Sequence, residues 1–244
     1  MSEDHDPTRQ TPIQKYWSAT LSIIAINVVV FLIQLKWGGL GSEPTDSESR
    51  FNDLFALSLD GIRSGHIWQL VTYQFMHASW FHLAVNSWAI FVFGRILESI
   101  AGKGRMLQIY FLSGIAGGLL QTLWTLILPA QYNIPVVGAS AGASGLVAAF
   151  AVLLPSEPLL LLLFFVIPLK LKARTLLQLS CGFALLGMGL ILFKSKLMDD
   201  VAHAGHLGGL IGGYIYARML IRRYGPPRVI EKPIPSLKTA PVSN

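Results

Sequence analysis

The chain has 244 residues, of which 52% are hydrophobic and 13% are charged, and its mean hydropathy is +0.53. Soluble domains carry about a quarter charged residues, so this composition excludes a soluble enzyme, a disordered chain and a disulfide scaffold. The single cysteine, Cys181, excludes disulfide pairs and cysteine-based metal sites. A helix needs about 20 largely apolar residues to cross the hydrocarbon core. Charged residues are absent from five long stretches, 16–35, 64–94, 106–156, 175–193 and 201–217, so we expect an all-α, polytopic membrane protein.

Residues 1–15 are expected to form a cytoplasmic segment, because their acidic residues and the lack of an apolar core argue against a signal or transit peptide. The sequence predicts six spans, at about 17–35, 78–97, 106–128, 139–154, 175–193 and 201–220. With both termini in the cytoplasm, 14 of the 19 Lys and Arg residues fall on the cytoplasmic side, as the positive-inside rule requires. This distribution accounts for the pI of about 9.5 without nucleic acid as a partner.

Three segments are not predicted to span the membrane. Two of them lie within the predicted membrane domain (16–222), and the third follows it. The long external first loop, 36–77, begins as an acidic, flexible stretch and continues as an amphipathic one. We expect that part to lie on the membrane surface, with a role as gate or support for a site below as the alternative. Residues 158–169 are apolar but too short to span, which favours an interfacial or re-entrant segment. The proline-rich tail, 223–244, is expected to be disordered and cytoplasmic.

Polar side chains inside the spans are costly in lipid and usually functional. Taken singly, a serine here more often bonds its own helix carbonyl, and small residues mostly serve helix packing, as expected of Gly209 and Gly213. Those two glycines share one helix face with His206. Taken together, a serine, a histidine and a His/Asn pair supply a nucleophile, a base and oxyanion donors. The residues concerned are His82 and Asn86 in the second span, Ser140 and Ser144 in the fourth, and His203 and His206 in the sixth.

With these residues the sequence resembles the rhomboid family of intramembrane serine proteases, from about Trp68 to Tyr216. The matching motifs are Trp68-Gln69-Leu70-Val71-Thr72, the H-x4-H-x3-N run of His77, His82 and Asn86, the pair Gly94 and Glu98, and His206-Leu207-Gly208-Gly209 with Gly213.

The resemblance implies a six-transmembrane-helix rhomboid-like bundle that cleaves transmembrane segments of other membrane proteins within the lipid bilayer. It assigns the catalytic base to His206, oxyanion support to His82 and Asn86, and organisation of the first loop to His77. It implies no metal and no cofactor. We expect a multi-pass protein of the cell membrane, plasma or inner.

Two serines compete as the nucleophile. The short family motif G-x-S-G falls on Ser144, whereas the longer family pattern runs without a gap from Gly138 to Pro155 and selects Ser140. The longer register puts Ser144 where the family usually has an aromatic residue beside the catalytic histidine. We favour Ser140, because backbone N–H groups at a helix start remain available to an oxyanion.

Other readings of these motifs remain open. Residues 138–142 also fit the G-x-S-x-G elbow of soluble hydrolases, but that elbow needs a preceding strand and an acid between serine and histidine. The acids in that interval, Glu157, Asp199 and Asp200, all lie at predicted membrane edges, which favours a Ser–His dyad over a triad. The alternatives to a protease are a catalytically inactive rhomboid-like protein that binds membrane clients and a small transporter, although the internal repeats typical of a transporter are missing.

Overall fold

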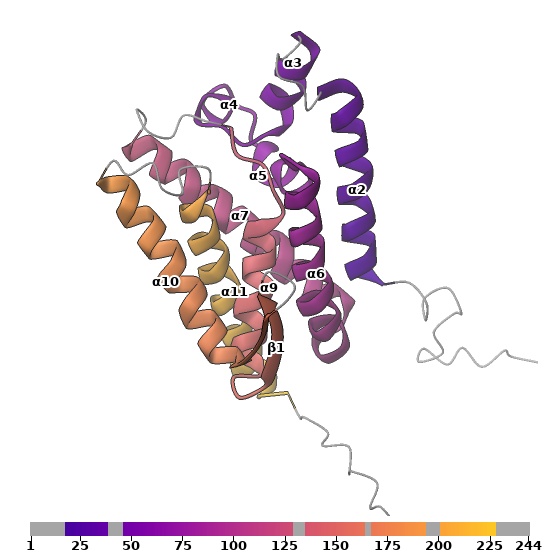
Figure 1. The fold of residues 1–244 in the computed structure, drawn as a ribbon, viewed down its shortest axis with the longest axis vertical. Coiled ribbons are helices and arrows are strands. Elements are labelled where there is room, and N and C mark those ends of the chain that lie inside the picture. The colour runs from indigo at the N-terminus through magenta and orange to yellow at the C-terminus, as the bar shows by residue number, and fades with distance from the viewer. Residues whose placement is uncertain (1–17, 39–45, 129–134, 164–166, 194–200, 228–244) are drawn as a thin grey trace, which may run out of the picture.

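The computed structural model describes residues 18–38, 46–128, 135–163, 167–193 and 201–227. The predicted segment 1–15 and the tail from residue 228 lie outside these ranges. Figure 1 shows a bundle of long helices, with short helices at one end and a β-hairpin at the other. The long helices are α2 (Ala19–Gly38), α6 (Trp80–Ala101), α7 (Lys103–Ile127), α9 (Ser140–Leu153), α10 (Ala173–Leu192) and α11 (His203–Tyr224).

These six helices coincide with the six predicted spans to within four residues at each end. Four of them, α2, α6, α7 and α10, are long and apolar enough to cross a membrane. Helix α9 is apolar but shorter, with 14 residues. The location of both termini in the cytoplasm stays a prediction.

Helix α9 forms the centre of the bundle and packs against α6, α7, α10 and α11. Half of its residues are alanine or glycine, and most of its residues are buried, so neighbouring helices approach its backbone closely. A Cβ atom added at Gly209 of α11 would overlap the backbone carbonyl of Ala141, and one added at Gly213 would overlap that of Gly145. Helices α9 and α11 are therefore in backbone contact at these two positions, as small residues permit.

The start of α2 is held by the end of α6. The Glu98 carboxylate accepts hydrogen bonds from the backbone N–H groups of Ala19 and Thr20, both 3.1 Å, and from the hydroxyl of Ser18, 2.9 Å. These N–H groups have no partner within their own helix, and a carboxylate at a helix N-terminus is also favoured by the helix dipole. The Gly94–Glu98 motif thus fastens α2 to α6, with Gly94 packed against the Thr20 side chain.

The first loop contains α3 (Asp46–Phe55), α4 (Leu59–Arg63), α5 (Gln69–Thr72) and the 3-10 helix η1 (Tyr73–Phe75). Side chains of its tryptophan-containing motif join these pieces. Gln69 accepts a hydrogen bond from Ser58 N, 3.1 Å, and donates one to the Asp53 carbonyl, 2.7 Å. The Trp68 indole donates to the Leu54 carbonyl, 2.7 Å. The loop is therefore a folded unit, which the amphipathic pattern alone did not predict.

The apolar segment 158–169 lies in an antiparallel hairpin of β1 (Pro158–Leu163) and β2 (Ile167–Lys172). Pro158 pairs with Lys172 at the open end of the hairpin. The length of this segment predicts an interfacial or re-entrant position, but length does not reveal that two short apolar runs pair their backbones with each other. The hairpin joins the end of α9 to the start of α10, as Figure 1 shows.

Replacing Gly209 or Gly213 by valine is expected to destabilise the protein in detergent. A side chain at either position meets backbone atoms of α9, so the two helices have to separate. Overpacking of a close-packed core costs about 1–3 kcal/mol, and we expect a loss at the upper end of this range or beyond. Thermal unfolding of the purified variants measures the loss.

Gly189→Val in α10 provides the matched control, because a Cβ at Gly189 meets nothing within 4 Å. An unchanged melting temperature for both Gly209→Val and Gly213→Val would contradict the backbone contact between α9 and α11.

Candidate active site

The N-terminal ends of α9 and α11 bring a serine and a histidine together. The imidazole Nε2 of His206 lies 2.8 Å from the hydroxyl Oγ of Ser140, and both side chains are partly buried. Ser140 is the first residue of α9, and His206 lies in the first turn of α11. At this distance the imidazole can take a proton from the hydroxyl.

The backbone before Ser140 is held by the first loop. Val136 and Leu57 exchange two backbone hydrogen bonds of 2.8 and 2.9 Å, and Gly138 N–H donates to the Tyr73 carbonyl, 2.9 Å. Gly138 has φ of +133°, a conformation that favours glycine. The loop thereby orients the start of α9, which supports the reading of the first loop as a support for the site.

The start of α9 also presents backbone donors. Ala143 N–H donates to the Ala139 carbonyl, 2.9 Å, so the N–H of Ser140 precedes the first bond of the helix ladder. Ser144 lies one turn further along, inside the ladder. An anion forming at Ser140 therefore has a backbone donor beside it, whereas one forming at Ser144 does not.

The start of α11 is held by a residue of α7 that sequence reasoning missed. Gln121 is buried, and its side-chain oxygen accepts a hydrogen bond from Gly205 N–H, 3.0 Å. This bond occupies one of the first N–H groups of α11, next to His206. A polar side chain within a predicted span is costly and usually functional, so the presence of Gln121 in the third predicted span is the feature of the sequence that indicates it.

His203 and Phe183 flank the histidine of the site. The His203 ring is buried, lies 5.3 Å from the Phe183 ring, and lies 6.5 Å from the His206 ring at 88° between planes. It packs over Gly187 of α10, where a Cβ would overlap the imidazole. His203 was identified in the sequence, but nothing in the spacing indicated Phe183 or Gly187 as its neighbours.

His82 borders the same space as Ser140. A Cβ added at Gly138 would lie 2.8 Å from His82 Nε2 and 3.7 Å from Ser140 Oγ. Ala78 N–H donates to Nδ1 of His82, 3.4 Å, and this bond leaves the proton of a neutral ring on Nε2. His82 therefore directs an N–H donor toward the region of Ser140.

Asn86 lies one turn below His82 on α6 and is 4% exposed. Its amide nitrogen has no hydrogen-bond partner among the described residues. A buried amide without a partner is costly, so this nitrogen remains available to an acceptor from outside the chain.

His77 is buried next to His82 and contacts three elements, α2, η1 and α6. Its backbone N–H donates to the Gln34 side chain of α2, 3.1 Å, and its ring lies 5.2 Å from the His82 ring. Its Nδ1 lies 3.3 Å from the Phe75 carbonyl. Burial and the neighbouring His82 lower the pKa of His77 to about 4, so its ring is neutral at pH 7. These contacts suit a role in organising the first loop.

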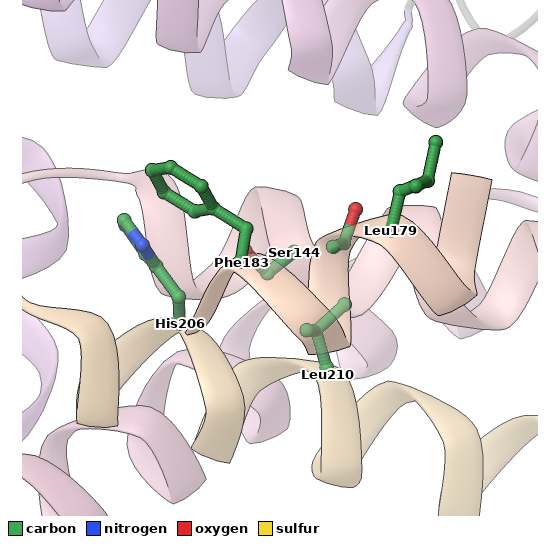
Figure 2. Close-up of a pocket in the computed structure, with 6 residues that line it drawn as sticks. Ser144, Leu179, Phe183, His206 and Leu210 are labelled. Atoms are coloured by element: carbon green, nitrogen blue, oxygen red, sulfur yellow. The ribbon is translucent and has the colours of Figure 1, made fainter. Parts of the chain in front are cut away.

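A cavity of about 300 Å³ extends from the site between α9, α10 and α11. Its lining residues are Ser144, Leu179, Ser180, Phe183, His206 and Leu210. Figure 2 shows His206 and Phe183 at one end of this cavity and Leu179 at the other. Ser144 occupies the position at which the long family pattern has an aromatic residue, and its small side chain leaves room for the cavity. The aromatic ring that borders the cavity is that of Phe183, from α10.

No described carboxylate hydrogen bonds to His206. Glu157 lies beyond the far end of α9 from Ser140, and Asp199 and Asp200 lie outside the described residues. The described part of the site therefore consists of a serine, a histidine and neutral N–H donors.

Comparison with known proteins places these residues in context. A family model of the rhomboid domain matches residues 64–223. The chain is 27% identical to the rhomboid protease GluP of Bacillus subtilis, over 82% of this chain and 34% of that protein. It is 28% identical to the rhomboid protease AarA of Providencia stuartii, over 80% of this chain and 69% of that protein. It is 33% identical to the inactive RHOMBOID-like protein 8 of Arabidopsis thaliana, over 42% of this chain and 28% of that protein. This chain thus spans about a third of GluP.

Labelling with a fluorophosphonate probe, followed by peptide mapping, is expected to find the label on Ser140. Of the two candidate serines, Ser140 is the one that combines contact with His206 and a backbone N–H at a helix start. Ser140→Ala is therefore expected to abolish labelling, and Ser144→Ala, the matched control one turn away, is expected to retain it. The reverse pattern would move the reactive serine one turn deeper.

Proposed function

Because this chain belongs to the rhomboid family of multi-pass membrane proteins, we propose that it is a serine endopeptidase that cleaves transmembrane segments of other membrane proteins. Ser140 is the nucleophile and His206 the base of a catalytic dyad. The observation that carries this proposal is the 2.8 Å separation between His206 Nε2 and Ser140 Oγ.

The proposed reaction proceeds by acyl transfer. His206 takes the proton of Ser140 while Oγ attacks the carbonyl carbon of the scissile peptide bond. The tetrahedral intermediate collapses with cleavage of the C–N bond, and His206 returns the proton to the leaving amine. Water, deprotonated by His206, then hydrolyses the ester on Ser140 and regenerates the hydroxyl.

The developing oxyanion is held by the Ser140 N–H, His82 Nε2 and Asn86 Nδ2. Support comes from the tautomer that Ala78 imposes on His82 and from the unpartnered amide nitrogen of Asn86 among the described residues. Fixed donors in a water-poor site stabilise the transition state without reorganising. His77 positions His82 and does not take part in the proton transfers.

The proposed topology has six spans, with both termini in the cytoplasm of a cell whose plasma or inner membrane holds the protein. Helix α9 rises about 20 Å from Ser140 to its last residue, Leu153, two residues before Pro155, at 1.5 Å per residue. If Pro155 lies at the cytoplasmic face of a core about 30 Å thick, Ser140 lies below the outer surface. Water then reaches the dyad from the outside, and the substrate helix has to unwind to offer its carbonyl.

The alternative is a catalytically inactive rhomboid-like protein that binds membrane clients without cutting them; one relative, RHOMBOID-like protein 8 of Arabidopsis thaliana, is named as inactive. The pairing of Ser140 and His206 favours the protease. Purified protein incubated with a model transmembrane substrate separates the two, since the protease yields a discrete product and the binding protein yields a complex with intact substrate.

His206→Ala is expected to reduce cleavage by at least about a thousandfold, because the base is lost and only the donors remain. The variant keeps Gly209 and Gly213, so its thermal unfolding should stay close to that of the wild type. His66→Ala, in the first loop and outside the site, is the matched control and is expected to cleave normally. Cleavage by His206→Ala at the wild-type rate would rule out the dyad.

Asn86→Ala is expected to lower kcat about a hundredfold with little change in KM, as the loss of one oxyanion donor does in other enzymes. Ser87→Ala, the adjacent small polar change on α6, serves as the control and should keep the wild-type kcat. Equal effects of both changes, or a change in KM alone, would remove Asn86 from the oxyanion site.

A further inference from the structure

A second cavity, of about 260 Å³, lies at the end of the bundle remote from Ser140. Four helices contribute to it: the last turn of α6, the first turn of α7, the end of α9 and the end of α11. In Figure 1 this end of α11 lies at the same end of the bundle as the hairpin. The cavity is therefore separate from the candidate active site.

Two guanidinium groups lie near one aromatic ring, that of Tyr224, and one of the two, Arg105, lines the cavity together with this ring. The guanidinium carbon of Arg105 lies 4.3 Å from the centroid of the Tyr224 ring, and that of Arg223 lies 5.4 Å from the same centroid. Arg105 also donates to the Ala101 carbonyl, 3.5 Å. Neither arginine forms an ion pair with a described carboxylate, and the Glu98 carboxylate is occupied by the start of α2.

Two like charges near one ring repel each other, and contact with the ring offsets only part of that cost. An anion bound at Arg105 reduces this repulsion. The planar fork of a guanidinium matches the oxygens of a phosphate group. The charge arrangement therefore points to a phosphate group as the missing partner.

The walls of the cavity indicate the rest of the ligand. Leu153 is buried at its base, while Leu220 is partly buried and Ile100 is 38% exposed along its side. Free phosphate gains nothing from such apolar walls, whereas an acyl chain does. The ends of the helices are also where lipid head groups meet a membrane protein.

We propose that this cavity binds the phosphate group of an anionic phospholipid at Arg105, with the lipid chain along Ile100 and Leu220 and with Arg223 adding positive charge nearby. The bound lipid joins the start of α7 to the end of α11, which the side-chain contact between Gln108 and Tyr216 also connects. This proposal rests on the membrane location of the protein and not on its catalytic activity.

Native mass spectrometry of the full chain in detergent tests the site, with phosphatidylglycerol and phosphatidylcholine as lipid probes. We expect one phosphatidylglycerol to bind at least about fivefold more tightly than phosphatidylcholine, since a cation near the membrane surface contributes about 1 kcal/mol toward an anionic lipid. By the same reasoning, Arg105→Gln should weaken phosphatidylglycerol binding about fivefold, and Arg105→Lys should retain most of it.

Arg218→Gln removes an exposed charge from α11 outside the cavity and is the matched control, expected to bind as the wild type does. Leu220→Trp keeps both arginines and fills the space along the apolar wall, so it should also weaken binding. It tests the site independently of whether Arg105→Gln folds. Equal affinity for the two lipids, or equal losses in Arg218→Gln and Arg105→Gln, would overturn the proposal.

Thermal unfolding distinguishes a lipid from a soluble anion. Phosphatidylglycerol is expected to raise the melting temperature of the wild type and not of Arg105→Gln. Stabilisation by inorganic phosphate equal to that by phosphatidylglycerol would overturn the assignment to a lipid.

Discussion

The backbone contact between α9 and α11 is the constraint on which the candidate site depends. Gly209 and Gly213 let the carbonyls of Ala141 and Gly145 approach α11 without an intervening side chain. An imidazole reaches only a few ångströms from its own helix, so a larger separation would remove His206 from hydrogen-bond distance of Ser140. The 2.8 Å contact between them is thus a consequence of residues that have no side chains.

Two polar side chains in this bundle hold the starts of long helices. Glu98 accepts from the first N–H groups of α2, and Gln121 accepts from Gly205 at the start of α11. In lipid the unpaired N–H groups of a helix start have no water to bind, so partners within the protein matter more there than in a soluble fold. The Asn86 amide nitrogen is one of several buried polar atoms without a hydrogen-bond partner in the described part of the chain, and it lies one turn from His82.

The first loop and the candidate site are connected by hydrogen bonds and ring contacts. The Leu57–Val136 bridge and the bond from Gly138 to the Tyr73 carbonyl tie the approach to Ser140 to the loop helices. His77 connects the same loop to α2 and to the His82 ring. Ser144, in the position of an aromatic residue in the family pattern, leaves the cavity open toward α10, where Phe183 supplies a ring. Changes in the loop or in α10 therefore reach the Ser140–His206 pair through direct contacts.

The sequence by itself determined the six helices and the candidate residues, because the length of an uncharged stretch and the spacing of polar residues within it are properties of the chain alone. It also identified Ser140, Ser144, His82, Asn86 and His206 as candidates, and left the two serines in competition. Only the tertiary structure decided which serine His206 contacts, since that depends on the depth at which α9 and α11 cross. Only the tertiary structure shows the roles of Gln121 and Phe183, because their partners are distant in the chain. It alone shows the hairpin within 158–169, because that pairing is made by backbone hydrogen bonds. Neither kind of contact produces a periodic pattern in the sequence.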